Sequence, residues 1–356
     1  MKRLTLVIIL LSALTIAIPF PVFGSGGEAQ GTADAPQATI QAAPPYPPDT
    51  VVHGVYLPPV NNYGEEILAF NEEAGKDIGI IHYYVGWYYS AWTWLPSRIE
   101  AQVPAERRPQ IMLSWVPKGR NCRTMDPYEQ GDWAVNPSLY DIRDGYCDEY
   151  IRQMGRQLKG MPFTFMIRFG NEMNISAAVW WVGHYNNDPQ LYIDAYRRIY
   201  DVFEQEGITN VQWVWAPSYS SSPREEWNSL FNYYPGDKYV DWISIVAYNW
   251  GEWLGVPWWS LNDLLDSDTW DHVMPEIMCR YAKPIMWEGA TVEGTRPSDG
   301  SKAGWVTDAY SSLERYPFIQ AVAWFNEWDD HVPTKADFRV VGGSSLDPDP
   351  LSLIHI

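Results

Sequence analysis

The chain has 356 residues, of which 46% are hydrophobic and only 19% are charged. It can therefore bury a large core and is too apolar for a disordered protein. The formal net charge is −19, and an acidic surface repels phosphate backbones, which argues against nucleic acid as a partner. The chain also carries 20 Trp and 23 Tyr, and flat aromatic rings stack well on sugar faces. A neutral polysaccharide fits this composition better than a polyanion.

Residues 1–24 have the pattern of a secretory signal peptide. Basic residues at positions 2 and 3 precede an apolar stretch over 4–18, and residues 22–24 offer a small-residue cleavage site. The apolar stretch is short for a membrane span, and two prolines interrupt its end. We therefore expect a secreted, extracellular protein without stable membrane insertion after the signal is removed.

Residues 25–49 are rich in Ala, Gln, Gly and Pro, which predicts a flexible linker. Strand-like and helix-like segments then alternate over residues 50–343, which we interpret as one catalytic domain. Eight segments are expected to form strands: Val51–Leu57, Gly79–Trp87, Pro109–Trp115, Pro162–Asn171, Asn210–Ala216, Val240–Tyr248, Lys283–Glu288 and Ile319–Phe325.

Helical patterns lie between several of these strands, over Asp141–Leu158, Pro189–Glu206 and Lys302–Arg315. Eight strands alternating with helices predict an α/β fold, the parallel (β/α)₈ TIM barrel. A doubly wound sheet is the alternative, but no glycine-rich phosphate loop follows the first strand.

The end of the chain departs from a regular barrel. A barrel normally adds one more helix after its eighth strand, whereas residues 344–350 are turn-rich and only six residues follow them. We therefore expect an incomplete final helix and a C-terminal tail over 344–356, whose last six residues we interpret as non-native.

The three cysteines allow at most one internal disulfide, because their number is odd. We expect Cys122 to pair with Cys147, since both flank the third connection of the barrel, which leaves Cys279 free. No Cys/His spacing is typical of a metal site, and we expect neither a metal nor a cofactor.

Two glutamates at strand ends are the main functional feature. Glu172 follows the strand expected over 162–171, and Glu288 closes the strand expected over 283–288. A carboxylate at the end of a buried strand is costly, because desolvation opposes its charge. Two such carboxylates suit acid/base and nucleophile work on one bond, as glycoside hydrolysis requires. Glu293 and Glu327 lie further into loops and complete the pair less well.

Several motifs resemble those of glycoside hydrolase family 26, and the resemblance covers Val51 to Asp330. Members of that family are mostly endo-β-1,4-mannanases, with some β-1,3-xylanases and mixed-linkage β-glucanases. The motifs are Arg168, Asn171-Glu172-Met173-Asn174, Trp180-Trp181, Trp213-Val214-Trp215-Ala216-Pro217, Tyr234-Pro235-Gly236-Asp237 before Val240-Asp241-Trp242, Tyr248-Asn249, and Lys283-Pro284 with Glu288.

The resemblance implies a retaining endo-β-glycanase that acts by double displacement. Glu288 is expected to attack the anomeric carbon, while Glu172 protonates the leaving oxygen and then activates water. The two carboxyl groups should lie about 5–5.5 Å apart, and Glu172 should have a raised pKa. A non-catalytic carbohydrate-binding barrel is the alternative function.

One position departs from the family pattern. Its mannanases usually carry His directly before the acid/base glutamate, whereas this chain has Asn171. That residue is expected to reach toward the sugar's 2-hydroxyl, whose orientation separates mannose from glucose and xylose. The substrate is therefore left open among mannan, β-glucan and β-xylan.

Further residues are expected to bind substrate. Tyr248 could donate a hydrogen bond to Glu288, and Arg168 could stabilise its charge from beneath the site or form a structural ion pair. The resemblance makes Trp324 an aromatic floor under the reacting sugar. Four more tryptophans at or just after strand ends could line a cleft or pack in the core, namely Trp87, Trp180, Trp181 and Trp250.

Overall fold

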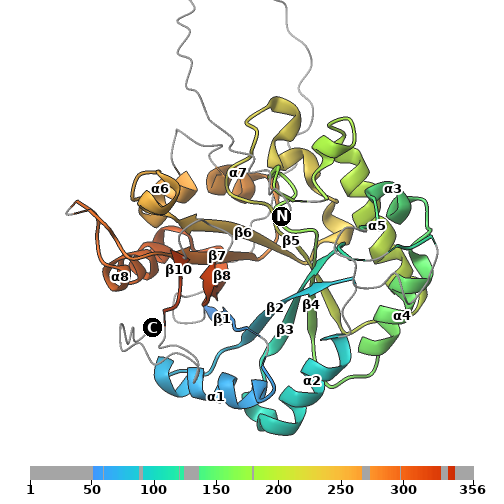
Figure 1. Cartoon of the computed structure of the whole chain (residues 1–356), viewed down its shortest axis with the longest axis horizontal. Helices are drawn as coiled ribbons and strands as arrows, with labels where there is room; N and C mark the ends of the chain where they lie inside the picture. The colour runs from blue at the N-terminus through green and yellow to red at the C-terminus, as the bar shows by residue number, and fades with distance from the viewer. Residues whose placement is uncertain are drawn as a thin grey trace, which may run out of the picture. The chain divides into compact units, whose positions relative to one another are not determined.

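The computed structural model describes residues 51–329, apart from 59, 88–90, 120, 124–135, 179, 267–272 and 297, and also residues 336–340. Eight parallel strands close into a barrel in chain order (Figure 1). They are β1 Val52–Tyr56, β2 Ile80–Gly86, β3 Gln110–Val116, β4 Phe165–Phe169, β5 Val211–Trp215, β6 Trp242–Asn249, β7 Ile285–Thr291 and β8 Ile319–Phe325.

The predicted (β/α)₈ barrel is thus confirmed, and each expected strand overlaps its counterpart. The barrel closes where β8 pairs with β1, in a register that sets Val52 against Ala321 and Tyr56 against Phe325. The expected end of β7 is wrong, because this strand continues three residues beyond Glu288 to Thr291. Glu288 therefore lies inside its strand, on the wall of the barrel.

The α-helices of the described residues pack outside the strands (Figure 1). Their bounds are α1 Tyr63–Ala74, α2 Ala91–Gln102, α3 Leu139–Arg143, α4 Asp148–Leu158, α5 Pro189–Gln205, α6 Leu261–Asp266, α7 Val273–Arg280 and α8 Lys302–Ser312.

The predicted helices over 189–206 and 302–315 correspond to α5 and to α8, which continues as a 3₁₀ turn over Leu313–Arg315. The helix expected over 141–158 is two helices instead. Gly145 between α3 and α4 has a φ of 84°, which a continuous right-handed helix cannot accommodate. Two of the helices that we did not predict, α2 and α7, contain a proline, namely Pro96 and Pro275. A proline inside a segment normally argues against a helix there.

The inside of the barrel changes from apolar to polar along the strands. An apolar cluster includes Ile80, Met112, Met166 and Met286. Two residues further along the same strands, on the same face, lie His82, Ser114, Arg168 and Glu288, all buried. We call these four side chains the polar layer. It lies toward the carboxyl ends of the strands, where barrel enzymes place their catalytic groups.

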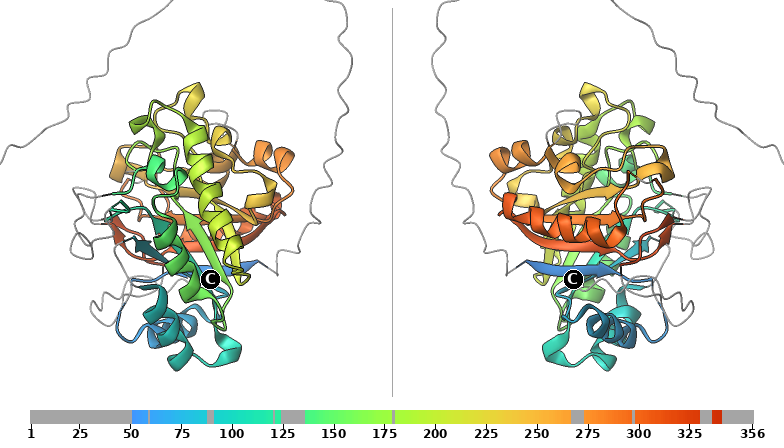
Figure 2. Two further views of the ribbon diagram at one scale, coloured as in Figure 1. Left: turned by 90° about the vertical axis from the view of Figure 1, so that its right-hand side faces the viewer. Right: turned by 90° about the vertical axis from the view of Figure 1, so that its left-hand side faces the viewer.

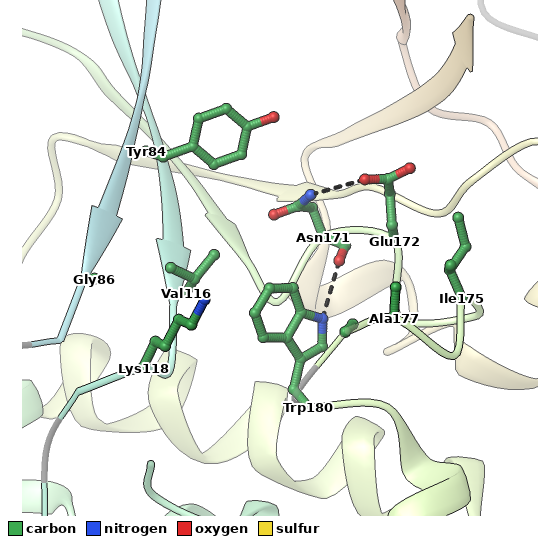
Figure 3. A pocket seen from close by; sticks show the side chains of 10 residues that line it. Tyr84, Gly86, Val116, Lys118, Asn171, Glu172, Ile175, Ala177 and Trp180 are labelled. Carbon is green, nitrogen blue, oxygen red and sulfur yellow. Dashed lines mark hydrogen bonds between the residues drawn. The ribbon is translucent and has the colours of Figure 1, made fainter. Parts of the chain in front are cut away.

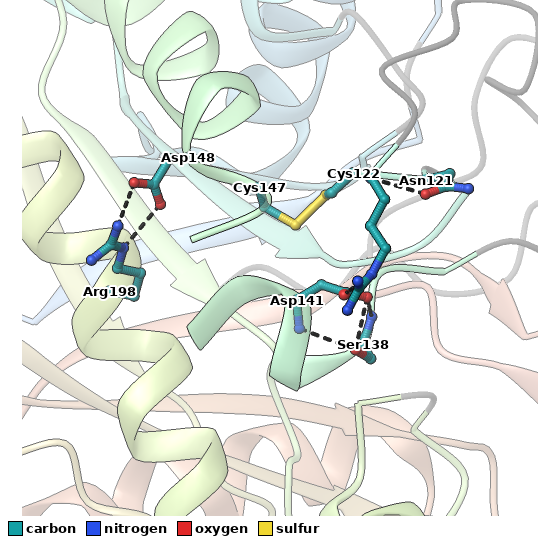
Figure 4. The surroundings of a disulfide bond; sticks show 8 residues. Asn121, Cys122, Ser138, Asp141, Cys147, Asp148 and Arg198 are labelled. Atoms are coloured by element: carbon teal, nitrogen blue, oxygen red, sulfur yellow. Dashed lines mark hydrogen bonds and ion pairs between the residues drawn. A yellow bond between two sulfur atoms is a disulfide. The ribbon is translucent and has the colours of Figure 1, made fainter. Parts of the chain in front are cut away.

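The predicted disulfide is confirmed, because Cys122 is bonded to Cys147 (Figure 4). Cys147 is the N-cap of α4, so the bond ties the segment after β3 to the start of that helix. Next to it, the carboxylate of Asp148 forms an ion pair with Arg198 of α5. Cys279 is exposed and carries no disulfide.

The predicted signal peptide over 1–24, the linker over 25–49 and the tail over 344–356 lie outside the described residues, as does the expected incomplete final helix, so these remain predictions. Within the described part of the chain, every helix is too short or too polar to cross a membrane.

Candidate active site

Arg168 on β4 is the centre of the site. Its side chain is fully buried, and its Nη1 forms an ion pair with Oε2 of Glu288 on β7. Its Nε donates to Ser114 Oγ on β3 at 2.7 Å, and its Nη2 donates to the Tyr84 hydroxyl on β2 at 3.2 Å. Side chains from three other strands therefore converge on the Arg168 guanidinium, because alternate residues of each strand face into the barrel. The ion pair that was one of the two predicted roles of Arg168 is confirmed, and its partner is Glu288 itself.

Glu288 lies in a setting that favours its charged form. Its side chain is about 1% exposed, and Arg168 contacts one carboxylate oxygen. The Tyr248 hydroxyl on β6 approaches the other oxygen, Oε1, at 3.5 Å, as expected from the sequence. A guanidinium and a hydroxyl are both donors, so they stabilise a negative carboxylate rather than a neutral acid.

Glu172 lies just after β4 in a tight turn. Its φ is 53° and that of Gly170 is 51°, so the chain reverses through the left-handed region, which costs a non-glycine residue about 1 kcal/mol or more. The Glu172 backbone N–H donates to Ala216 O at 2.7 Å, which fixes the turn to the end of β5. Burial raises the pKa of the Glu172 carboxyl, although the Arg168 charge and a hydrogen bond from Asn171 oppose that shift. This carboxyl is therefore held toward its protonated form.

A cavity of about 410 Å³ lies beside Glu172, between the ends of β2 and β3 and the segment after β4 (Figure 3). Its volume falls in the range of small-ligand pockets. Figure 3 shows Asn171, Glu172 and Trp180 together, with Tyr84 across from them. The lining residues are Tyr84, Gly86, Val116, Lys118, Asn171, Glu172, Ile175, Ala177, Ala178 and Trp180.

Asn171 presents an unused acceptor beside this cavity. Its side chain is 4% exposed, and its Nδ2 lies 3.4 Å from Glu172 Oε2. Its Oδ1 is buried and has no hydrogen-bond partner among the described residues. A buried acceptor without a partner is costly, so a ligand hydroxyl that donates to it would be favoured. The expected contact of Asn171 with the sugar's 2-hydroxyl stays a prediction.

Of the tryptophans predicted to bind substrate, Trp180 lines the cavity, whereas Trp250 and Trp181 do not. Trp180 lines the cavity, with its Nε1 donating to Asn171 O at 2.9 Å. Trp250 is half-buried and packs edge-on against Phe338, near Tyr248. Trp181 is also half-buried but does not line the cavity, since its Nε1 points to Asn228 Oδ1 at 3.4 Å.

The structure does not bring Trp324 or Trp87 to the site. Trp324 is 1% exposed and donates to the Tyr310 hydroxyl of α8, which lies over the outer face of the barrel (Figure 2, right). Glu288 pairs with Ala323 in the sheet, so Ala323 faces inward with it and Trp324 faces outward. Trp87 is fully buried against Tyr150 of α4. Both tryptophans are core residues.

Phe325 occupies the inward position that Trp324 was expected to take. Its ring stacks on that of Tyr56, with centroids 5.0 Å apart, and lies 6.1 Å from Tyr248. Successive side chains of β8 point alternately into and out of the barrel, so Phe325 and Trp324 must face opposite ways. The sequence alone does not tell which of the two faces inward.

Besides Phe325, four further members of the polar and aromatic site were not predicted: Tyr56, His82, Tyr84 and Ser114. Strand β2 holds a sequence pattern that could have identified two of them. Ile80, His82 and Tyr84 occupy every second position of an otherwise apolar strand, so they point to the same face. His82 is buried, and its burial together with the Arg168 charge holds its pKa well below the ordinary value. The imidazole is therefore neutral.

The rival acids take other positions. Glu293 is exposed, and its carboxylate accepts from the backbone N–H of Lys302 at 3.0 Å, at the start of α8. Glu327 interacts with the Tyr56 hydroxyl at the barrel mouth. In the residues that the structure describes, no three His, Cys, Asp or Glu side chains are grouped to hold a metal ion.

Known proteins are similar to this chain in sequence and in fold. Residues 140–253 match the model of Glycosyl hydrolase family 26. The chain is 30% identical over 268 residues to Endoglucanase H of Acetivibrio thermocellus, a match that covers 73% of this chain and 26% of that protein. The chain therefore spans about a quarter of the length of this curated relative.

Solved structures share the fold. The family-26 domain of an endo-β-mannanase/endo-β-glucanase from Prevotella bryantii aligns with a TM-score of 0.52 and 16% identity, over 80% of this chain and 86% of that one. A family-26 β-mannanase from Bacteroides ovatus gives 0.53 and 17%, over 78% and 80% of the two chains. The catalytic domain of an endo-β-1,4-mannanase from Bacillus sp. JAMB-750 gives 0.53 and 15%, over 78% and 77%. Over residues 140–253 the chain is thus similar to glycoside hydrolase family 26, and it shares its fold with solved structures of that family.

Proposed function

We propose that this chain is a retaining endo-β-glycanase that cleaves β-linked polysaccharide by double displacement. The observation that carries the proposal is the contrast between two carboxyl groups. Glu288 is paired with Arg168, and burial beside an open cavity raises the pKa of Glu172. Double displacement needs one ionised and one protonated carboxyl group, and these environments supply them.

Each residue then has a defined task. The Glu288 carboxylate attacks the anomeric carbon and forms a glycosyl-enzyme, while Glu172 gives its proton to the departing glycosidic oxygen. Glu172, now ionised, takes a proton from a water molecule while the water oxygen bonds to the anomeric carbon and the bond from that carbon to Glu288 breaks; this releases the sugar and restores the Glu288 carboxylate and the protonated Glu172. The unpartnered Asn171 Oδ1 accepts a hydrogen bond from a sugar hydroxyl near the reacting carbon.

We propose β-glucan rather than mannan as the substrate class. Asn171 replaces the histidine that mannanases of this family usually carry, so the contact near the 2-hydroxyl differs. The relative with 30% identity is named an endoglucanase, which supports the same choice. We also propose that the protein is exported, as its first 24 residues and its disulfide suggest.

The first prediction concerns the carboxylate pair. Glu172→Ala and Glu288→Ala should each lower hydrolysis of β-glucan by about 10²–10⁴-fold, because each removes a group that reacts in the transition state. Added azide should distinguish them on an activated β-glycoside. Glu172→Ala should yield the β-glycosyl azide, because azide attacks the glycosyl-enzyme, and Glu288→Ala should yield the α-glycosyl azide, because azide replaces the nucleophile.

Glu293→Ala is the matched control and should retain wild-type turnover, because Glu293 lies at the start of α8. Wild-type turnover in either site variant, or the same azide product from both, would contradict the assignment. Binding of glycans without release of reducing ends by the wild type would favour a binding barrel.

A second prediction concerns the substrate. In parallel assays, mixed-linkage β-glucan should be cleaved with a higher kcat/KM than β-mannan or β-1,3-xylan. Asn171→His should lower kcat/KM on β-glucan at least tenfold more than on mannan, because it removes the amide acceptor beside Glu172. A wild-type preference for mannan would overturn the substrate assignment without affecting the carboxylate roles.

A third prediction links the raised pKa of Glu172 to stability. The folded protein holds this proton more tightly than the unfolded chain, so stability is lost as pH rises from the unfolded pKa through the folded one. Glu172→Gln carries no such cost. It should melt roughly 1–3 °C above the wild type at pH 8, and the difference should disappear near pH 4. A melting temperature at pH 8 equal to or below that of the wild type would contradict the raised pKa.

A further inference from the structure

His82 lies beneath the carboxylate pair, and no step of the proposed reaction uses it. It is on β2, is 1% exposed and belongs to the polar layer. Its Nε2 lies 2.6 Å from Ser114 Oγ and 3.3 Å from Arg168 Nη2. One ring nitrogen therefore contacts both the Ser114 hydroxyl and the Arg168 guanidinium.

The hydrogen bonds determine which form of the ring is present. Ser114 Oγ accepts from Arg168 Nε, so its hydroxyl hydrogen is available to donate to His82 Nε2. Arg168 can only donate, so its Nη2 also requires an acceptor at that nitrogen. Nε2 must then be unprotonated, and the neutral ring carries its hydrogen on Nδ1.

The other groups around the ring are consistent with a neutral histidine. The Tyr84 and Tyr56 rings lie 4.8 Å and 5.6 Å from it, and Arg168 is the charged group in contact with it among the described residues. Burial and the Arg168 charge both disfavour an imidazolium. A proton on Nε2 would turn the acceptor into a donor and set a second cation against Arg168.

We propose that neutral His82, together with Ser114, is a positioning residue that holds the Arg168 fork so that its Nη1 meets Glu288. This inference rests on the proposed function, because it concerns how the nucleophile is aimed. Nε is held by Ser114 and Nη2 by Tyr84 and His82, which leaves Nη1 directed at the Glu288 carboxylate.

Without the imidazole acceptor, Arg168 Nη2 keeps only the Tyr84 hydroxyl as a partner among those named above. Tyr84 is 36% exposed at the cavity and is a less rigid partner than the buried ring. The guanidinium can then rotate, and Glu288 moves with it. Misplacement of a reacting group by about 1 Å can cost on the order of 10²-fold in rate. The effect should appear in kcat rather than KM, because His82 does not line the cavity.

The test compares two variants of similar size. In His82→Gln, the amide oxygen lies as many bonds from Cα as Nε2 does and can accept the same hydrogen bonds, whereas His82→Met cannot replace that acceptor. His82→Met should lower kcat on β-glucan about 10–100-fold with KM changed less than about twofold. His82→Gln should recover most of that loss.

His53→Met is the matched control. His53 lies on β1, and its Nδ1 is 3.1 Å from the Tyr310 hydroxyl of α8, away from the polar layer. It should keep wild-type kcat. Equal kcat for His82→Met and His82→Gln, or wild-type kcat for His82→Met, would overturn the inference even if both glutamates prove essential.

A readout independent of hydrolysis separates this inference from the proposed function. Nitrogen-15 NMR of the wild-type ring at pH 6 should show protonated Nδ1 and bare Nε2. Hydrogen exchange at Arg168 Nε should be faster in His82→Met than in His82→Gln. If no β-glycan is cleaved but both NMR results hold, the proposed function fails, whereas the inference that His82 and Ser114 position Arg168 stands. An imidazolium, an Nε2-protonated ring, or equal exchange in the two variants would overturn that inference.

Discussion

The site depends on a buried ion pair between Arg168 and Glu288. Both side chains are essentially inaccessible to solvent, with exposed fractions of 0% and 1%. Two charges removed from water are stabilised only when each has good partners, and loss of one partner typically costs about 3–5 kcal/mol. Here the partners come from strands far apart in sequence: Ser114 on β3, Tyr84 and His82 on β2, and Tyr248 on β6. The closed barrel brings these strands around one interior, so the site can form only when the barrel is folded.

The same guanidinium also acts on the second carboxyl group. Its charge opposes the rise in the Glu172 pKa that burial causes, but burial is the larger effect. The arginine thus binds one acid directly and acts on the other through its charge alone, while Tyr84 accepts from the arginine and lines the cavity beside Glu172. The two side chains are chemically identical, so their surroundings alone set them apart: an ion pair at Glu288 and burial at Glu172.

The sequence predicts the barrel well because parallel strands buried on both faces are continuous apolar segments, which stand out between polar loops. It also draws attention to both glutamates, because a charge within or just after such an apolar segment is conspicuous. It does not reveal which residues of a strand face inward. A shift of one residue exchanges the faces, so the family resemblance, which made Trp324 the aromatic floor, did not reveal that Phe325 is the residue that faces inward. His82, Tyr84 and Ser114 were missed for the same reason, since only the register connects them to Arg168. The break at Gly145 and the helices containing Pro96 and Pro275 depend on local backbone geometry that hydrophobic periodicity does not report.

The most direct test of this account is covalent trapping with an activated 2-deoxy-2-fluoro-β-glucoside or the corresponding cellobioside, followed by mass spectrometry of peptides. The fluorine slows both steps, and a good leaving group restores the first, so the glycosyl-enzyme accumulates. The account predicts one added glycosyl group per chain, on the peptide that contains Glu288 and on that residue. Labelling of Glu172, Glu293 or Glu327 instead, or β-glucan hydrolysis whose first product has inverted anomeric configuration, would contradict it.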